Sequence, residues 1–460
     1  MKKRITLTEG NIVKTLIQLS LPIMGTSFIQ MAYNMTDMLW LGNYGSKAVA
    51  AVGTAGFFSW FGNSLVLISK TGAEVGVAQA LGKNENSEAK KIINNSIKLN
   101  LIIAVLYGVI LILLRKPLID FFKLGDSDVI HMADIFLIIS SLGMVFTFVN
   151  PILTGIFNAS GESKIPFLIN TVGLVYNMVL DPILIFGLGP VPEMGVTGAA
   201  ISTVTAQMVV TLLFLYALKN RKDAFLKIKL FEKLDINSIK KILRLGLPVA
   251  MQNGLFSIFA MFIARIIAVY GSTAIAVQKV GAQIEAISWM TAGGLSTALS
   301  AFVGQNFGAK KWDRIFKGYF ATMLLASAIG FFATLLLVFG GKAIFGVFIP
   351  EAEAISLGKM YLRILGYSQL FMCIEITTSG AFNGLGKTIY PSITGIVLTG
   401  ARIPLAIILS APNMLGLNGV WWSISISSIL KGIILTGIFT AVVLVPKRKE
   451  LRVLEKLKID

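Results

Sequence analysis

Charged residues are scarce in this chain. Asp, Glu, Lys and Arg together make up 14% of its 460 residues, whereas soluble domains contain about 25%. Hydrophobic residues make up 55%. A chain with so little charge has too few polar side chains to cover a water-exposed surface, so we expect an all-α integral membrane protein.

Cysteine and histidine are scarcer still, with one residue of each, Cys373 and His131. Cys373 has no second cysteine for an intrachain disulfide. A zinc site or a histidine-based catalytic triad needs partner residues that the chain does not have. The sequence also contains no HExxH motif. We therefore expect neither an enzyme nor a protein with a resident cofactor.

Long apolar runs fill most of the chain. A membrane-spanning helix needs about 20 mostly apolar residues, and by this measure the sequence predicts twelve transmembrane helices. The runs lie at about 16–41, 48–72, 96–114, 132–157, 166–187, 195–217, 242–269, 277–303, 317–340, 357–382, 388–410 and 418–445.

The positive charge is concentrated between certain runs. The net charge is +18, and Lys and Arg gather at the N-terminus, after the second, sixth and eighth runs, and in the C-terminal tail. This bias marks the cytoplasmic side of a membrane protein. It predicts a multi-pass protein of the cytoplasmic (inner) membrane with both termini in the cytoplasm. Membrane topology then accounts for the basic runs, so we expect the lipid bilayer and no nucleic acid as a partner. We also expect a monomer.

An internal repeat joins the two halves of the chain. Leu19-Ser-Leu-Pro22 recurs as Leu245-Gly-Leu-Pro248, and Tyr44-Gly-Ser46 recurs as Tyr270-Gly-Ser272, both at the same offset along the chain. Six spans return the chain to the same side, so the halves run in parallel. This predicts two six-helix bundles around a central cavity, related by an axis along the membrane normal. The predicted domains are an N-terminal lobe at 1–220, a cytoplasmic linker at 221–241, and a C-terminal lobe with a basic tail at 242–460.

Two aspartates lie inside apolar runs of the first half. Asp37 and Asp181 fall about 6–10 Å inside the outer ends of their runs, at 1.5 Å per residue, and Thr203 reaches a similar depth. An unpaired aspartate in a span costs about 2.5–3.5 kcal/mol. Asn177 and Asn34 precede the two acids by about one helical turn. These five residues predict one oxygen-lined site for Na⁺ or a proton; the alternative is that each aspartate is only a structural hydrogen-bond anchor.

The second half does not repeat this pattern, since Ile263 occupies the position that matches Asp37. Four charged residues within its runs, Arg265, Glu285, Glu375 and Arg402, leave two interpretations open: a structural ion-pair network, or a cluster that contacts substrate or forms a gate. We predict that the substrate cavity or gate includes Arg265, Glu285, Glu375, Arg402, Gln252 and Tyr33.

Several motifs resemble the MATE family of multidrug and toxic compound extrusion transporters. They are Asn34-Met-Thr-Asp37, Ala78-Gln-Ala-Leu-Gly82, Asn177-Met-Val-Leu-Asp181-Pro182, Gly195-Val-Thr-Gly-Ala-Ala200 and Val303-Gly-Gln-Asn-Phe-Gly-Ala309. The resemblance covers nearly the whole chain.

This resemblance implies twelve helices in two bundles. It also implies export of organic, mostly cationic or lipophilic drugs by alternating access, in exchange for Na⁺ or H⁺. The matching aspartates, asparagine and threonine then form the cation site of the N-terminal lobe.

The resemblance leaves the subgroup to be decided. NorM-type members have an acid in the seventh span, where this chain has Gln252, Asn253 and Arg265 but no acid. This departure favours a DinF-like arrangement with coupling in the N-terminal lobe. The alternative function is a lipid-linked saccharide flippase of the same superfold, whose cavity would be rich in arginine. The few interior bases here, offset by acids, argue against it.

Overall fold

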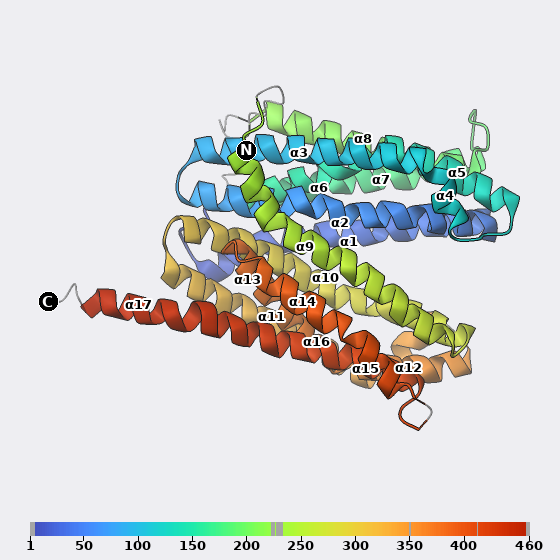
Figure 1. The fold of residues 1–460 in the computed structure, drawn as a ribbon. Coiled ribbons are helices and arrows are strands. Elements are labelled where there is room, and N and C mark those ends of the chain that lie inside the picture. The colour runs from blue at the N-terminus through green and yellow to red at the C-terminus, as the bar shows by residue number, and fades with distance from the viewer. Residues whose placement is uncertain (1–4, 222–225, 227–232, 349–350, 412, 457–460) are drawn as a thin grey trace. The chain divides into compact units, whose positions relative to one another are not determined.

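The computed structural model describes residues 5–221, 226, 233–348, 351–411 and 413–456. These residues form helices, turns and bends and include no strand. The chain divides into two compact units (Figure 1). Unit 1 is built mainly from Leu21–Ala250, and unit 2 from Leu7–Ser20 together with the chain from Met251 onward.

Two long helices belong to both units. Helix α1 (Ile12–Tyr44) has its first turns in unit 2 and continues in unit 1, whereas α9 (Ile236–Ala268) begins in unit 1 and continues in unit 2. The sequence-based division placed the linker at 221–241, a stretch of which 222–225 and 227–232 lie outside the described residues. The two compact units divide within α1 and α9, 33-residue helices that each begin in one unit and continue in the other.

The remaining helices of unit 1 follow the chain in order. They are α2 (Ser46–Gly82), α3 (Asn86–Leu113), α4 (Arg115–Asp120), α5 (Ser127–Leu142), α6 (Met144–Ala159), α7 (Lys164–Phe186) and α8 (Gly195–Lys219).

Unit 2 is completed by a second series of helices and one π-helical turn, η2. They are α10 (Ser272–Gly308), α11 (Trp312–Phe348), α12 (Ala352–Gly366), α13 (Gln369–Gly384), α14 (Ile389–Gly400), α15 (Arg402–Leu409), α16 (Leu417–Phe439), η2 (Thr440–Leu444) and α17 (Val445–Lys456).

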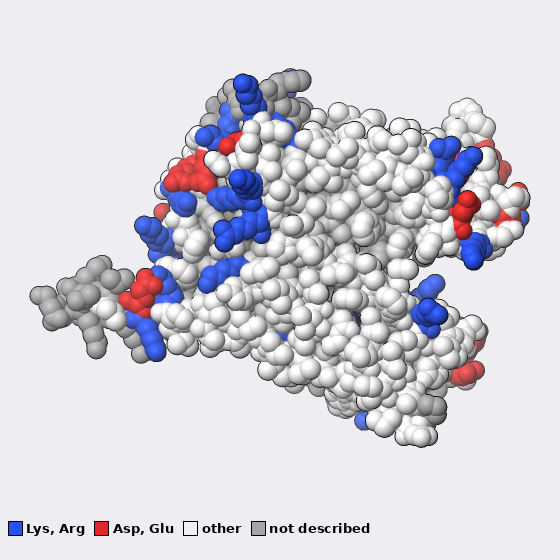
Figure 2. Space-filling view, viewed as in Figure 1, with Lys and Arg blue, Asp and Glu red and all other residues white. Residues whose placement is uncertain are grey.

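The helices are long and apolar enough to cross a membrane. Among the described residues, ten helical segments meet this standard, and the pair α5–α6, bent by 50°, makes eleven. The remaining predicted span, 357–382, corresponds to α12 and α13, which have 15 and 16 residues and are each shorter than the roughly 20 that a span needs. In Figure 2 the middle of the visible face is mostly white and most charged side chains gather towards its two ends, as expected for a bilayer-spanning protein.

The repeat is visible in the backbone. The fourth predicted span breaks at Gly143, and the tenth breaks at Tyr367–Ser368, the matching place in the second half. Asn84 and Lys310, which occupy matching positions of the repeat, both adopt a left-handed conformation, with φ of 62° and 58°. Each is the middle residue of the connection after the second span of its half. The two halves therefore share local geometry at places where their side chains differ.

Candidate functional site

A buried polar group joins α7 and α8 in unit 1. Asn177 and Asp181 lie on α7 and Ser202 on α8, and all three are at most 1% exposed. Asn177 Nδ2 donates to Asp181 Oδ1 at 3.1 Å and to Ser202 Oγ at 3.2 Å. Ser202 Oγ in turn donates to Asp181 Oδ1. The three side chains thus form one closed hydrogen-bonded triangle around a carboxylate.

Small residues bring these two helices together. On α7 the buried positions Gly173, Asn177 and Asp181 are four residues apart and therefore share one face. A Cβ at Gly173 would clash with Val210 of α8, and a Cβ at Gly198 would lie 2.5 Å from the carbonyl oxygen of Leu184. Because the backbones approach this closely, the short Ser202 side chain reaches the carboxylate.

Helix α1 adds a second carboxylate and a phenol. The Asp37 carboxyl group approaches the side chains of Asp181, Asn177 and Thr203. Tyr33, one turn earlier on α1, donates from its hydroxyl to the carbonyl oxygen of Thr203 at 3.4 Å. The two acids, Asn177, Thr203 and Tyr33 therefore meet at one place, as the depth argument predicts for the first four.

The donors do not satisfy all the acceptors of this group. Within the described part of the chain, Asp37 Oδ1, Asn177 Oδ1 and Asp181 Oδ2 are buried and accept no hydrogen bond. A buried polar oxygen without a partner costs about 1–3 kcal/mol, and more if charged. Two carboxylates this close also repel each other unless a proton or cation lies with them. Oxygen ligands of this kind suit a hard cation, so the residues fit either Na⁺ or a proton.

Two details of this group differ from the sequence-based prediction. Asn34 is exposed on α1, although three residues along a helix place it only about 60° around the helix from Asp37. Ser202 was not predicted, although it makes the closest contact to Asp181. The sequence could have indicated Ser202 in two ways. It is adjacent to Thr203, and it lies four residues from both Gly198 and Ala206 on the buried face of α8.

Proline shapes the backbone beside Asp181. Pro182 lies inside α7, and because proline has no backbone N–H, the carbonyl of Met178 loses its usual helical partner. This carbonyl is a further acceptor on the helix that carries Asp181. It adds to the excess of acceptors over donors.

Unit 2 contains a different polar network around Glu285. The carboxylate of Glu285 accepts from the Tyr361 hydroxyl and from Gln369 Nε2, the latter at 3.2 Å. Ser288 Oγ donates to Gln369 Oε1 at 2.6 Å. Both carboxylate oxygens of Glu285 therefore have donors. The network links α10, α12 and α13 and leaves Glu285 satisfied by neutral groups.

Glu375 forms its direct ion pair with a lysine. Lys431 Nζ of α16 lies 3.3 Å from Glu375 Oε2 of α13, and both side chains are buried. Arg402 donates from Nε to Ser427 Oγ at 2.5 Å and from Nη2 to Ser428 Oγ at 3.0 Å. Glu375 thus forms its direct ion pair with Lys431, a residue that is not among the four charged residues considered in the sequence for this half.

The other two predicted residues of this half lie apart from these networks. Arg265 is exposed on α9, so it does not join the buried charges. Gln252 packs directly on Gly395 of α14, where there is no room for a Cβ. Ile263, the repeat partner of Asp37, is a buried core residue at 6% exposure.

Comparison with known proteins gives the family. The family model MatE matches residues 22–183 and 248–408, which together cover well over half of the chain. The chain belongs to the MatE family. The two matched stretches begin at Pro22 and Pro248, the paired prolines of the repeat, so each half of this MatE protein is one copy of the family unit.

Curated relatives match along most of the chain. "Probable multidrug resistance protein NorM" of Thermotoga maritima is 29% identical over 416 residues, which cover 89% of this chain and 88% of the relative. "Probable multidrug resistance protein YoeA" of Bacillus subtilis is 26% identical and covers 87% of each chain. With the family match, these similarities show that the MatE chain is a membrane transporter and not an enzyme.

Solved structures share the fold. A multidrug resistance MATE family transporter in an outward-facing conformation has a TM-score of 0.86 and 25% identity, over 94% of this chain and 96% of that chain. A MATE structure in the bent conformation has a TM-score of 0.88 and 23% identity over the full length of both chains. The predicted fold class, an all-helical two-lobe transporter, is confirmed, and the flippase alternative finds no support in these comparisons.

Proposed function

We propose that this MatE protein is a secondary antiporter that exports organic, mostly cationic or lipophilic compounds in exchange for Na⁺ or H⁺ by alternating access. The single observation that carries the coupling assignment is the excess of buried oxygens around Asp37 and Asp181. Three of them accept no hydrogen bond within the described chain. A site that is complete only with an added cation or proton is suited to bind and release one.

The position of Asp37 gives this site a way to affect the rest of the protein. Asp37 and Tyr33 come from α1, whereas Asp181 and Asn177 come from α7 and Thr203 from α8. A cation or proton between the two acids would remove their repulsion. It would therefore draw α1 towards α7 and α8, and its release would let α1 move away. A ligand shifts a conformational equilibrium only through such a difference in affinity between states.

The networks of unit 2 support coupling in unit 1 alone. Glu285 and Glu375 are satisfied by protein donors, Glu375 by the ammonium group of Lys431. We propose on this basis a DinF-like arrangement, although relatives carry the name NorM. We further propose a monomer in the cytoplasmic membrane with both termini in the cytoplasm.

The test is drug efflux by purified protein in liposomes under an imposed Na⁺ or pH gradient. Asp37→Asn and Asp181→Asn remove the charge while keeping the shape, and both are expected to abolish gradient-driven efflux. Ser202→Ala removes one donor to Asp181, and we expect it to alter the ion concentration for half-maximal efflux by about tenfold, the effect of roughly 1.4 kcal/mol. Asp120→Asn is the matched control, because Asp120 is exposed on α4.

The gradient that drives efflux by the parent protein identifies the coupling ion. Parental efflux by both aspartate variants under either gradient would contradict the proposed coupling site. Loss of efflux in Asp120→Asn as well would point to a general loss of folded protein.

A further inference from the structure

The chain immediately before α1 is held by side chains from α10, from α11 and from the connection between them. Four successive carbonyl oxygens, those of residues 7 to 10, all accept hydrogen bonds from unit 2. Asn306 Nδ2 donates to the carbonyl of residue 7 at 3.0 Å, and Lys311 Nζ to that of residue 8 at 3.0 Å. Arg314 donates to the carbonyls of residues 7, 9 and 10 at 3.2, 2.9 and 2.8 Å. We call Asn306, Lys311 and Arg314 the N-terminal clamp.

The central residue of this clamp is itself fixed in place. Arg314 Nε donates to Asn306 Oδ1 at 3.2 Å, and the guanidinium group lies 5.6 Å from the centre of the Phe302 ring. Asn306 is fully buried and donates to the Phe302 carbonyl at 2.8 Å. Leu7 is fully buried as well. A planar guanidinium group held at several points is a rigid donor, which an ammonium group cannot replace.

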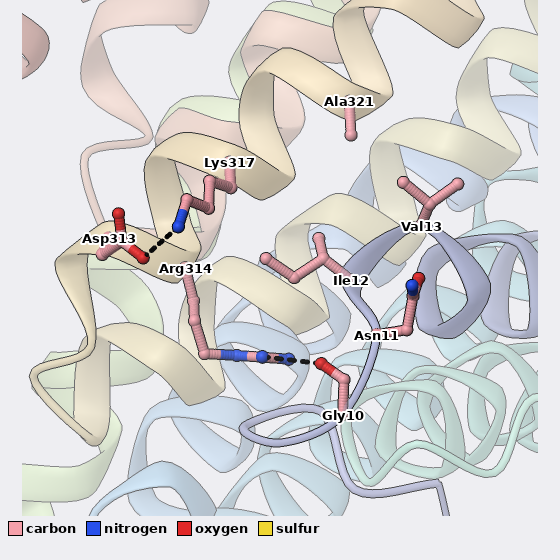
Figure 3. A pocket seen from close by; sticks show the side chains of 8 residues that line it. All are labelled: Gly10, Asn11, Ile12, Val13, Asp313, Arg314, Lys317 and Ala321. Carbon is pink, nitrogen blue, oxygen red and sulfur yellow. Dashed lines mark hydrogen bonds and ion pairs between the residues drawn. The ribbon is translucent and has the colours of Figure 1, made fainter.

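The clamp borders an open groove between the starts of α1 and α11. This groove has a volume of about 440 Å³ and is lined by residues of both segments (Figure 3). Figure 3 shows Arg314 reaching to Gly10, while the neighbouring Lys317 turns to Asp313, at 2.8 Å. Arg314 and Lys317 are therefore neighbouring cations on one helix that bind different partners.

The clamp lies directly before the helix that carries Asp37. The side chain of Asn11 caps α1 by accepting from the backbone N–H of Lys14 at 3.0 Å. From there α1 continues as one helix to Tyr44. Asp37 lies roughly 38 Å further along, at 1.5 Å per residue. Pro22 lies between the clamp and Asp37, but α1 stays helical through it, so the position of its first turn helps to set the position of Asp37.

The repeat supports a shared role for this position. Glu88 occupies the position of the first half that matches Arg314, and its carboxylate pairs with Lys241 of α9 at 2.5 Å. Each residue thus holds the beginning of the first helix of the opposite half of the chain. The chemistry differs, since Arg314 binds backbone carbonyls and Glu88 binds a side chain. Only α1 carries an acid at the repeat position of Asp37, so only the N-terminal clamp bears on coupling.

We propose that Arg314 is a positioning residue for Asp37: by fixing the chain before α1, it sets where α1 presents Asp37 to Asp181. This inference rests on the proposed function. It assigns a role to the Val303–Ala309 motif, whose Asn306 supports Arg314. The position in the first half that corresponds to Asn306 is Ala80, which has no polar side chain. The two halves therefore differ at the motif position that the clamp uses.

The test compares Arg314→Ala and Arg314→Lys with Lys317→Ala as the matched control. Hydrogen exchange of backbone amides at residues 7–16 measures whether the start of α1 is released. Efflux from liposomes is measured over a range of coupling-ion concentrations. We expect faster exchange in both Arg314 variants. We also expect at least a fivefold change in the ion concentration for half-maximal efflux, within the usual range of coupling between sites.

The expected signature separates positioning from loss of folded protein. Arg314→Ala should change the ion dependence while the maximal rate at saturating ion stays near that of the parent, and Lys317→Ala should change neither. Arg314→Lys keeps the charge, so a full return to parental behaviour would show that charge alone matters and would overturn the proposal.

The remaining outcomes are also decisive. Released amides with parental ion dependence would reject positioning while leaving the proposed coupling site intact. Parental efflux by Asp37→Asn would instead reject the coupling site itself. If Arg314→Ala does not fold, Asn306→Ala replaces it, because this change removes one carbonyl contact and the support for Arg314.

Discussion

Buried acids in the two units are satisfied by different means. Glu375 has an ammonium partner and Glu285 has two neutral donors. Asp37 and Asp181 have an amide, a hydroxyl and each other, and one oxygen of each accepts no hydrogen bond in the described chain. An acid that is paired with a lysine needs no added cation. Two acids side by side, in contrast, need a cation or a proton between them. The difference in partners, more than the number of acids, therefore favours unit 1 as the coupling unit.

Glu375 and Lys431 should depend on each other for stability. Glu375→Gln alone leaves a buried ammonium group unpaired, and Lys431→Met alone leaves a buried carboxylate unpaired. We expect each single change to destabilise the protein by about 3–5 kcal/mol. The double variant should recover most of this loss, because no uncompensated charge remains. Thermal unfolding in detergent measures all three.

The corresponding cycle with Arg402→Gln serves as the control. Arg402 donates to Ser427 and Ser428 and not directly to Glu375, so it should give weaker recovery. Additive losses for Glu375 and Lys431 would contradict a direct pair.

Sequence reasoning located acids better than it located their partners. Depth along a span depends only on counting residues, and it brought Asp37, Asp181, Asn177 and Thr203 to one level. Ser202 and Lys431 were missed for a common reason. Which of two adjacent hydroxyl residues faces Asp181 depends on helix rotation, and Lys431 meets Glu375 across 56 residues of chain. Neither fact is contained in spacing along the sequence.

At the scale of elements, the starts of α1 and α9 are held where the chain enters them. The segment before α9 is bound by α3, since Asn95 Oδ1 accepts from the backbone N–H of Asp235 at 2.9 Å. Asp235 then caps α9. Its carboxylate accepts from the Ser238 hydroxyl at 2.6 Å and from the backbone N–H of Ser238 at 3.2 Å. Such caps stabilise a helix start by satisfying its free N–H groups.

The Asp235 cap should open at acid pH. The Ser238 hydroxyl bond, followed by backbone N–H bonds, lowers the pKa of Asp235 below its ordinary value. A lowered pKa in the folded state stabilises the cap above the unfolded value of about 3.9. This stabilisation is lost as the pH falls through the lower folded value. A spin label at an introduced Leu234→Cys, in a Cys373→Ser background, should become more mobile below about pH 4.

Asp235→Asn is the control for this titration. It keeps an oxygen acceptor for the cap but cannot titrate, so the mobility of the label should no longer change between neutral and acid pH. The same acid-induced mobility in this variant would assign the transition to another group.

At the scale of the whole molecule, the repeat predicted the fold because its matching motifs can be recognised in the sequence at a fixed spacing. One offset relates the proline motifs, the left-handed residues at 84 and 310, and the two matches to the family. The division of α1 and α9 between units has no such signal. The sequence of such a long helix is the same whether its first turns pack on its own half of the chain or on the other half. Tertiary contacts such as those of Arg314 and Glu88 determine to which unit these turns belong.

Coupling in the proposed antiporter must be reciprocal. If the coupling ion weakens drug binding by some factor, drug must weaken ion binding by the same factor, because both describe one cycle of equilibria. We expect this factor to lie between about 5 and 150, the usual range for coupled sites. Titration calorimetry on the purified protein can measure drug affinity with and without saturating ion, and ion affinity with and without saturating drug.

The aspartate variants make this test specific to the proposed site. In Asp37→Asn and Asp181→Asn the factor should fall to about one, since a ligand that binds both states equally shifts nothing. Drug affinity in these variants should then match the ion-free parent or the ion-bound parent at all ion concentrations. Arg314→Ala should reduce the factor without removing it, because both acids remain and only their alignment changes. A full parental factor in both aspartate variants would show that the ion acts through other residues.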